Sequence, residues 1–143
     1  MNLPAAAHTG KLVVYQVFTR LFGNQNSTNK PWGTLAENGV GKFADFDDRA
    51  LAAIRAYGVS HLWYTGVLHH ALLTRYPNIS DDHPSVVKGR AGSPYAIKDY
   101  YNVNPDLATD PRHRLAEFAA LVARTHAHGM QVIIDIVPNH LAR

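Results

Sequence analysis

The chain of 143 residues contains no cysteine, only two glutamates and no long run of apolar residues. The lack of cysteine excludes disulfides and thiolate chemistry but does not fix the compartment. No window approaches the ~20 apolar residues that a membrane span needs, so no membrane partner is expected. The 14 Lys and Arg residues are scattered singly, and without a basic stripe nucleic-acid binding is disfavoured.

The remaining composition is that of a globular domain. Apolar residues make up 46% and charged residues 17% of the chain, whose formal charge is +3. Its length suffices for one domain with a sizeable core. The segment Met1 to Gly10 has neither the charged lead nor the apolar stretch of a signal peptide. A cytoplasmic location is therefore the default expectation, with a secreted or periplasmic one left open, and the oligomeric state is not predicted.

Three segments have the composition of buried strands, because they are rich in β-branched and aromatic residues. They span residues 11–18, 59–65 and 130–136. Helical patterns separate them, which gives the order βαβαβ. Helical connections of this kind join parallel strands, so a doubly wound sheet or a (β/α)8 barrel is expected as the parent fold.

The two expected helices have identifiable ends. Asp45 or Asp47 caps the first, and Gly58 follows its last turn. Asp110 with Pro111 after it is typical of the start of the second, which Gly129 ends. The apolar faces hold Leu51, Ile54 and Tyr57 in the first helix and Leu115, Phe118, Leu121, Val122 and Thr125 in the second.

Two long segments are predicted to be loops. Residues 23–41 are rich in Gly, Asn and Ser, and residues 66–109 show no sustained periodicity. A loop as long as the second is usually functional in a compact domain. His69 and His70 lie in it, but neighbouring residues on an extended chain point to opposite faces and rarely bind one metal ion. Ordinary hydrogen bonds are therefore the favoured interpretation of this pair.

The chemistry of nucleotides is disfavoured, since neither a Gly-x-Gly-x-x-Gly motif nor a P-loop follows any predicted strand. Glycosidic cleavage needs two carboxyl groups about 5 to 10 Å apart. Both glutamates are poorly placed for that role, because Glu37 lies in an expected loop and Glu117 within a helix. Asp135 with a loop aspartate is an alternative that nothing in the spacing requires.

Polar side chains follow the third predicted strand directly. Asp135, Asn139 and His140 come where a parallel strand delivers its carboxyl end to the binding face of an α/β protein. The second long loop adds Tyr95, whose flat ring suits a sugar. Tyr100 and Trp63 are equally well explained as core residues.

These residues carry a family resemblance. Asp135-Ile-Val-Pro-Asn139-His140 resembles the first signature segment of the alpha-amylase family of glycoside hydrolases, Asp-x-Val-x-Asn-His at the end of barrel strand three. Residues 95–105 are similar to the family's Tyr-x-x-x-Asp-Tyr-x-x-Val-x-Pro, residues 126–135 to its helix-to-strand passage, and residues 14–22 to its first barrel strand. The resemblance spans nearly all of residues 11–143.

The resemblance implies a sugar-binding role for three residues. Tyr95 would stack on the sugar at the cleavage subsite, and His140 would bond the hydroxyl groups of that sugar. Asp135 would brace the site structurally. No catalytic residue is implied within this chain, because the family's nucleophilic Asp, acid Glu and third Asp follow barrel strands four, five and seven.

Four further residues are implied to support the site. Asp99 would hold the loop that presents Tyr95, and Gln16 or Arg20 would support its base. Asn139 corresponds to a calcium ligand in many alpha-amylases, and to a structural hydrogen-bonding residue in members without the ion. No cofactor is implied to be required, with calcium left open.

Two departures make a subfamily assignment unsafe. The family often has proline after strand two, where this chain has Thr65-Gly66, and Pro94 replaces the glycine that usually precedes Tyr95. Neither change touches the chemistry.

We therefore expect residues 1–143 to be an incomplete catalytic barrel domain, truncated after strand three and inactive alone. The open sheet edges would make it marginally stable and prone to associate. The intact protein would be a retaining hydrolase or transferase of α-glucosidic bonds, with an α-glucan or α-glucoside substrate. The alternatives are a non-catalytic carbohydrate-binding or scaffold protein and an unrelated small α/β protein with a loop metal site.

Overall fold

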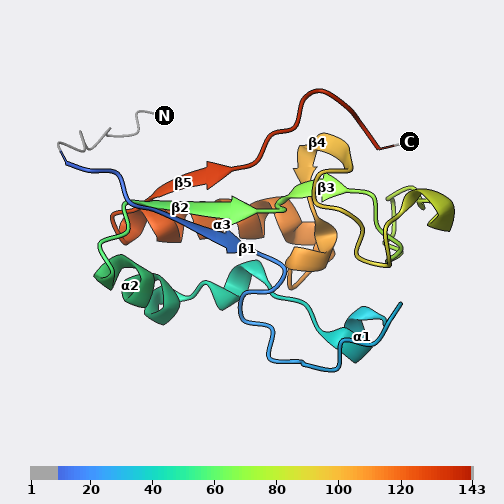
Figure 1. Cartoon of the computed structure of the whole chain (residues 1–143), viewed down its shortest axis with the longest axis horizontal. Coiled ribbons are helices and arrows are strands. Elements are labelled where there is room, and N and C mark those ends of the chain that lie inside the picture. The colour runs from blue at the N-terminus through green and yellow to red at the C-terminus, as the bar shows by residue number, and fades with distance from the viewer. Residues whose placement is uncertain (1–9, 143) are drawn as a thin grey trace.

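The computed structural model describes residues 10–142, shown in Figure 1. A three-stranded sheet has the order β1-β2-β5, and a second sheet pairs β3 with β4. The strands are β1 (Val14–Phe18), β2 (His61–Thr65), β3 (Leu68–His70), β4 (Ile97–Val103) and β5 (Gln131–Ile134). The α-helices are α1 (Leu35–Asn38), α2 (Asp48–Ala56) and α3 (Arg114–Ala127). Short 3-10 turns span Phe43–Asp45, Pro84–Val86, Pro105–Leu107 and Pro111–His113.

The three-stranded sheet is parallel throughout, as predicted. β1 pairs with β2 from Val14 opposite His61 to Phe18 opposite Thr65, and β2 pairs with β5 from His61 opposite Gln131 onward. The carboxyl ends of all three strands therefore meet at one edge of the sheet, beside β3 and β4 (Figure 1). This edge is the one at which α/β proteins bind their ligands.

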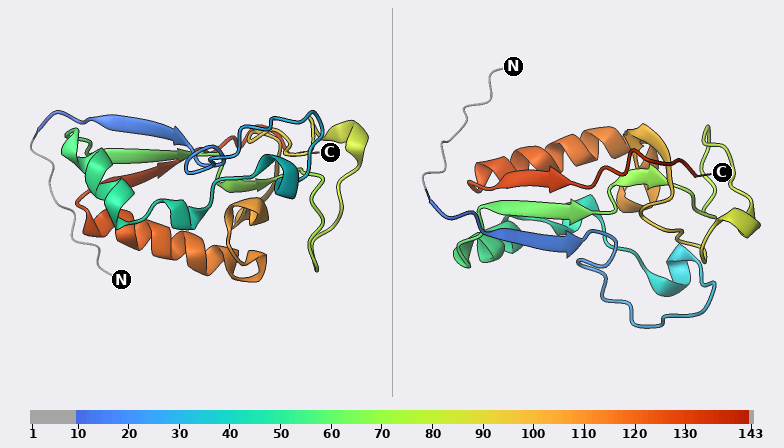
Figure 2. Two further views of the ribbon diagram at one scale, coloured as in Figure 1. Left: turned by 90° about the horizontal axis from the view of Figure 1, so that it is seen from below. Right: turned by 45° about the horizontal axis from the view of Figure 1, so that its top comes forward.

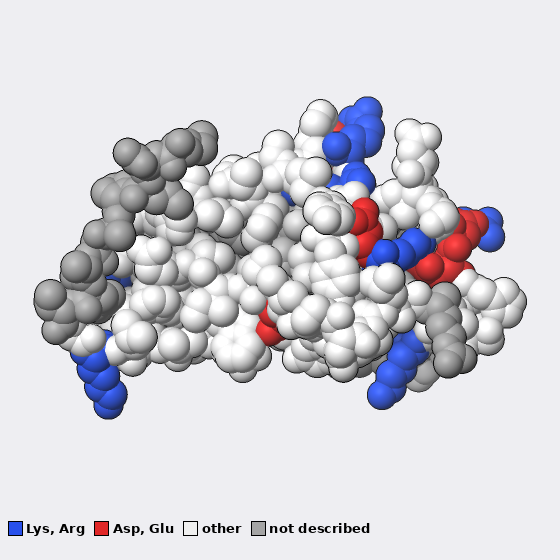
Figure 3. All heavy atoms as spheres, turned by 90° about the horizontal axis from the view of Figure 1, so that it is seen from above, with Lys and Arg blue, Asp and Glu red and all other residues white. Residues whose placement is uncertain are grey.

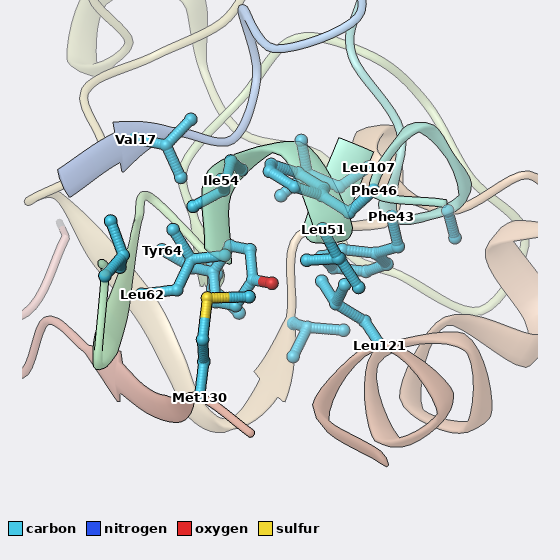
Figure 4. Packing of buried hydrophobic residues seen from close by; sticks show 14 residues of the cluster. Val17, Phe43, Phe46, Leu51, Ile54, Leu62, Tyr64, Leu107, Leu121 and Met130 are labelled. Carbon is cyan, nitrogen blue, oxygen red and sulfur yellow. The ribbon is translucent and has the colours of Figure 1, made fainter. Parts of the chain in front are cut away.

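Helices α2 and α3 both lie on one side of the three-stranded sheet, as Figure 2 shows. The core fills the space between them and includes the fully buried Leu62 and Tyr64 of β2 (Figure 4). The Tyr64 ring meets Phe46 edge-on, with ring centroids 4.9 Å apart, and its hydroxyl lies 2.7 Å from Thr125 Oγ1 on α3. Burial raises the pKa of Tyr64 to about 12, so this hydroxyl stays neutral and hydrogen-bonded in the core.

The helix ends differ in detail from the prediction. Asp47 is the cap of α2 and accepts the N–H of Ala50 at 2.8 Å, but the helix ends at Ala56 and leaves Tyr57 86% exposed. Its expected place on the apolar face is therefore wrong. Asp110 caps a 3-10 turn, and α3 begins only at Arg114. Leu115, within α3, is exposed, so its expected place on the apolar face is wrong as well.

The prediction of loops without secondary structure is wrong in both long segments. Residues 23–41 contain the short α1, in which Thr34 and Glu37 form a reciprocal capping box, so Glu37 is helical. Residues 66–109 contain β3 and β4, which pair antiparallel with register shifts on both sides of His69. Those shifts interrupt the period of two by which a strand is found in a sequence.

Two further expectations concern the N-terminal segment and a possible membrane span. The segment Met1 to Gly10 lies outside the described residues except for Gly10. Among residues 10–142, no helix has the length and apolar character that crossing a bilayer requires.

Candidate functional site

The carboxyl ends of β2 and β5 are joined through the side chain of Asp135. Trp63 on β2 donates its indole N–H to Asp135 Oδ1 at 2.6 Å, and the backbone N–H of Gly66 donates to Oδ2 at 3.3 Å. Both carboxylate oxygens thus accept a hydrogen bond, which fixes the orientation of the group. Asp135 is placed to brace this edge of the sheet.

Gln16 links the neighbouring strand to the same edge. Its Nε2 donates to Thr65 Oγ1 at 2.8 Å, across the β1-β2 pair. The three parallel strands are therefore tied together by side chains where they end. Polar groups at this edge are held by the sheet rather than by loops alone, which limits their mobility.

Tyr95 and His140 lie in contact, although 45 residues separate them. His140 Nε2 is 2.9 Å from the carbonyl oxygen of Tyr95 and must donate, because a carbonyl oxygen only accepts. The Tyr95 side chain is not consumed by this contact and remains 45% exposed. The structure thus brings the backbone of Tyr95 to His140 and leaves the Tyr95 ring partly exposed.

Tyr100 holds the segment that carries His140. Its hydroxyl donates to the carbonyl oxygen of Val137 and lies 3.1 Å from that of His140. Tyr100 is therefore partly buried beneath the chain after β5, and it positions that chain against the loop of Tyr95.

The side chains of Asp99 and Asn139 form no hydrogen bond with Tyr95 or His140 within the described residues. Asp99 is on β4, where its Oδ1 accepts the N–H of Tyr101 at 2.9 Å. Asn139 is exposed. No group of three or more His, Asp or Glu side chains able to hold one ion occurs within residues 10–142.

Arg20 belongs to a buried polar cluster that the sequence did not reveal. Its guanidinium lies 2.7 Å from Asp106 Oδ2, and the Asp106 side chain is fully buried. Tyr76 donates its hydroxyl to the other oxygen at 2.7 Å, and Lys42 Nζ lies 2.9 Å from the carbonyl oxygen of Ala108. The cluster fastens the loop after β1 to the turn that follows β4.

The sequence around Asp106 predicts a turn but does not predict that this turn is buried. Asn104-Pro105-Asp106 is a capped turn in which Asn104 Oδ1 accepts the N–H of Asp106 at 2.9 Å. Such turns are common at surfaces, and nothing local shows that this one is buried.

The two glutamates are engaged in local structure. Glu37 accepts hydrogen bonds from Lys30 and Thr34, which lower its pKa to about 2. Glu117 accepts the backbone N–H groups of Thr109 and Asp110, each at 2.7 Å. Neither residue lies at the carboxyl end of a strand. The general acid of a glycosidase needs a raised pKa beside the scissile bond, whereas the pKa of Glu37 is lowered.

Comparison with known proteins defines the class. A family model described as the alpha amylase catalytic domain matches residues 16–143. The cyclomaltodextrin glucanotransferase of Geobacillus stearothermophilus is 28% identical over 141 residues, covering 90% of this chain and 17% of the relative. That of Bacillus sp. (strain 38-2) is 26% identical over 140 residues, covering 90% and 18%. The chain belongs to the alpha-amylase family of glycoside hydrolases.

Solved structures agree with this assignment. An alpha-amylase from Lactobacillus plantarum has a TM-score of 0.61 to this chain and 32% sequence identity, covering 91% of this chain and 23% of that one. A maltogenic alpha-amylase from Thermotoga neapolitana has a TM-score of 0.59 and 25% identity, covering 91% and 24%. The chain spans less than a fifth of the length of the curated relatives named above.

Proposed function

We propose that this chain forms the first three strands of a (β/α)8 barrel in a retaining hydrolase or transferase of α-glucosidic bonds. Its substrate is an α-glucan or α-glucoside. Support comes from the family match and from the sheet, in which parallel strands follow one another in chain order with both long helices on one side. Successive barrel strands have this arrangement.

One observation carries the assignment of the sugar-binding wall, namely the 2.9 Å contact between His140 and Tyr95. In this proposal the Tyr95 ring stacks on the sugar at the cleavage subsite. The imidazole of His140 bonds the hydroxyl groups of that sugar with the nitrogen that the Tyr95 contact leaves free. Asp135 acts as a positioning residue, because Trp63 and Gly66 occupy both of its oxygens.

The nucleophile and the general acid come from sequence beyond this chain. Retaining cleavage needs two carboxyl groups about 5 Å apart across the scissile bond. Glu37 and Glu117 are held in helices by local hydrogen bonds, and Asp135 is held by Trp63. The 143-residue chain is therefore inactive alone and contributes one wall of the site.

Kinetics of the intact protein on maltooligosaccharides test this role. Tyr95→Ala removes the stacking ring, and we expect kcat/KM to fall by about 10- to 100-fold, or about 1–3 kcal/mol of transition-state binding. Tyr57→Ala is the matched control and should leave kcat/KM unchanged, because Tyr57 is 86% exposed just after the end of α2. Equal values of kcat/KM for the two variants would show that Tyr95 does not bind the substrate.

A further inference from the structure

A polar hollow lies against β3 and β4, apart from the contact of Tyr95 with His140. It has a volume of about 400 Å³, and its lining includes His69, Ser80, Lys98, Asp99, Asn102 and Arg114. Residues 69 and 99 are cross-strand partners, so their side chains share one face of the small sheet. Tyr100, the next residue on β4, reaches to the segment after β5 instead. The residues that line the hollow include neither Tyr95 nor His140.

Opposite charges balance in this hollow. Lys98 Nζ is paired with Asp82 Oδ1 at 2.9 Å, and both side chains are largely buried. The other charged residues in the lining are Arg114 and Asp99, one cation and one anion. Figure 3 shows basic and acidic side chains side by side at this end of the molecule, whereas the surface over the three-stranded sheet is almost uncharged. An anionic ligand would meet Asp99, and a cationic ligand would meet Lys98 and Arg114, so a neutral ligand fits best.

His69 lines the hollow and is itself almost fully buried. The residue is 3% exposed, and its Nε2 is buried without a hydrogen-bond partner among residues 10–142. Burial, with help from Lys98, lowers the pKa of His69 to about 4, so the imidazole is neutral at pH 7. A buried polar atom without a partner is rare in proteins, and a bound molecule that supplies the missing hydrogen bond is one way to explain it.

Donors and acceptors are both available around the imidazole. Asp99 uses Oδ1 for the N–H of Tyr101, and its second oxygen has no partner within the described chain. Asn102 Oδ1 accepts from Arg114 Nε at 2.8 Å, which leaves the NH2 group of Asn102 free. A ligand must therefore both donate and accept hydrogen bonds, as adjacent hydroxyl groups of a sugar do.

We propose that this hollow is a second carbohydrate-binding site, which holds a neutral sugar unit through Asp99, Asn102, Arg114 and His69. Its volume lies within the range of about 300–1,000 Å³ that is usual for small-molecule sites. The site goes beyond the proposed cleavage site and needs no catalytic carboxylate. It anchors a glucan chain at a distance from Tyr95, so its existence and the enzymatic activity are separate questions.

Titration of the wild-type chain with maltotriose tests the proposal, with the imidazole ¹⁵N signals of His69 followed by NMR at pH 7. We expect a saturable shift of the His69 signal, retained in Tyr95→Ala. Inorganic phosphate, as the alternative probe, should leave the signal unmoved. A shift with phosphate but not with maltotriose would assign the hollow to anions and overturn the proposal, as would no shift with either probe.

A matched pair of variants locates the binding. Asp99→Asn keeps the acceptor for Tyr101 but replaces a charged acceptor by a neutral one, and should weaken maltotriose binding about tenfold. Asp48→Asn is the control, because this aspartate is exposed at the start of α2. This variant should bind maltotriose with the affinity of the wild type. Circular dichroism verifies folding. Equal affinities of two folded variants would overturn the assignment, and if Asp99→Asn does not fold, the wild-type titration decides.

Discussion

Replacing Asp106 by asparagine should remove a large part of the stability of this chain. The Asp106 side chain is fully buried and lies 2.7 Å from the Arg20 guanidinium, which is itself 17% exposed. Asparagine can still accept the hydrogen bond from the Tyr76 hydroxyl, but it leaves the positive charge of Arg20 without a counter-ion. Breaking a buried ion pair in this way costs about 3–5 kcal/mol, against a total of about 5–15 kcal/mol for a typical domain.

The assay is urea unfolding followed by circular dichroism, with Asp81→Asn as the control. Asp81 also pairs with an arginine, at 3.0 Å from Arg75, but the two side chains are 53% and 83% exposed. Solvent screens such a pair, so its loss should change the free energy of unfolding by less than about 1 kcal/mol. Equal and small losses for Asp106→Asn and Asp81→Asn would refute the reasoning from burial.

Acid should destabilise the chain through His69. Its pKa is lowered to about 4 in the folded state, so between pH 6.5 and 4 the unfolded chain binds a proton that the folded chain does not. The free energy of unfolding therefore decreases by at most about 3 kcal/mol as the pH is lowered through this range. Urea midpoints at pH 7 and 4.5 should differ less in His69→Gln, and an unchanged difference would contradict this. Trp63→Phe removes the indole donor to Asp135 and should cost about 1–3 kcal/mol; an unchanged thermal midpoint would show that the bond contributes nothing.

The parallel sheet was predictable because its signals are local. β-branched and aromatic residues mark β1, β2 and β5, and Asp47 and Gly58 mark the ends of α2. β3 and β4 were missed because β3 has three residues and the pairing is irregular around His69. Their formation depends on partners in the other strand, which no local window contains.

The site was predictable only in part, and from the family resemblance rather than from spacing. The spacing of Tyr95 and His140 in the sequence does not predict a contact, yet the structure brings them together. The sugar-binding role of both residues stays a prediction. Asp106 was missed because its partners are distant in the chain: Arg20 lies 86 residues before it and Tyr76 30 residues before it. The orphaned nitrogen of His69 is likewise a property of the packed structure alone.

The most direct measurement compares the intact protein with the 143-residue chain for turnover of maltooligosaccharides, sucrose and trehalose. We expect the intact protein to cleave or transfer at least one α-glucosidic bond and the short chain to be silent, because Glu37 and Glu117 are held in local hydrogen bonds. Turnover by the short chain would contradict the account. Inactivity of the intact protein on every α-glucoside, with sugar binding retained, would instead favour a carbohydrate-binding or scaffold protein.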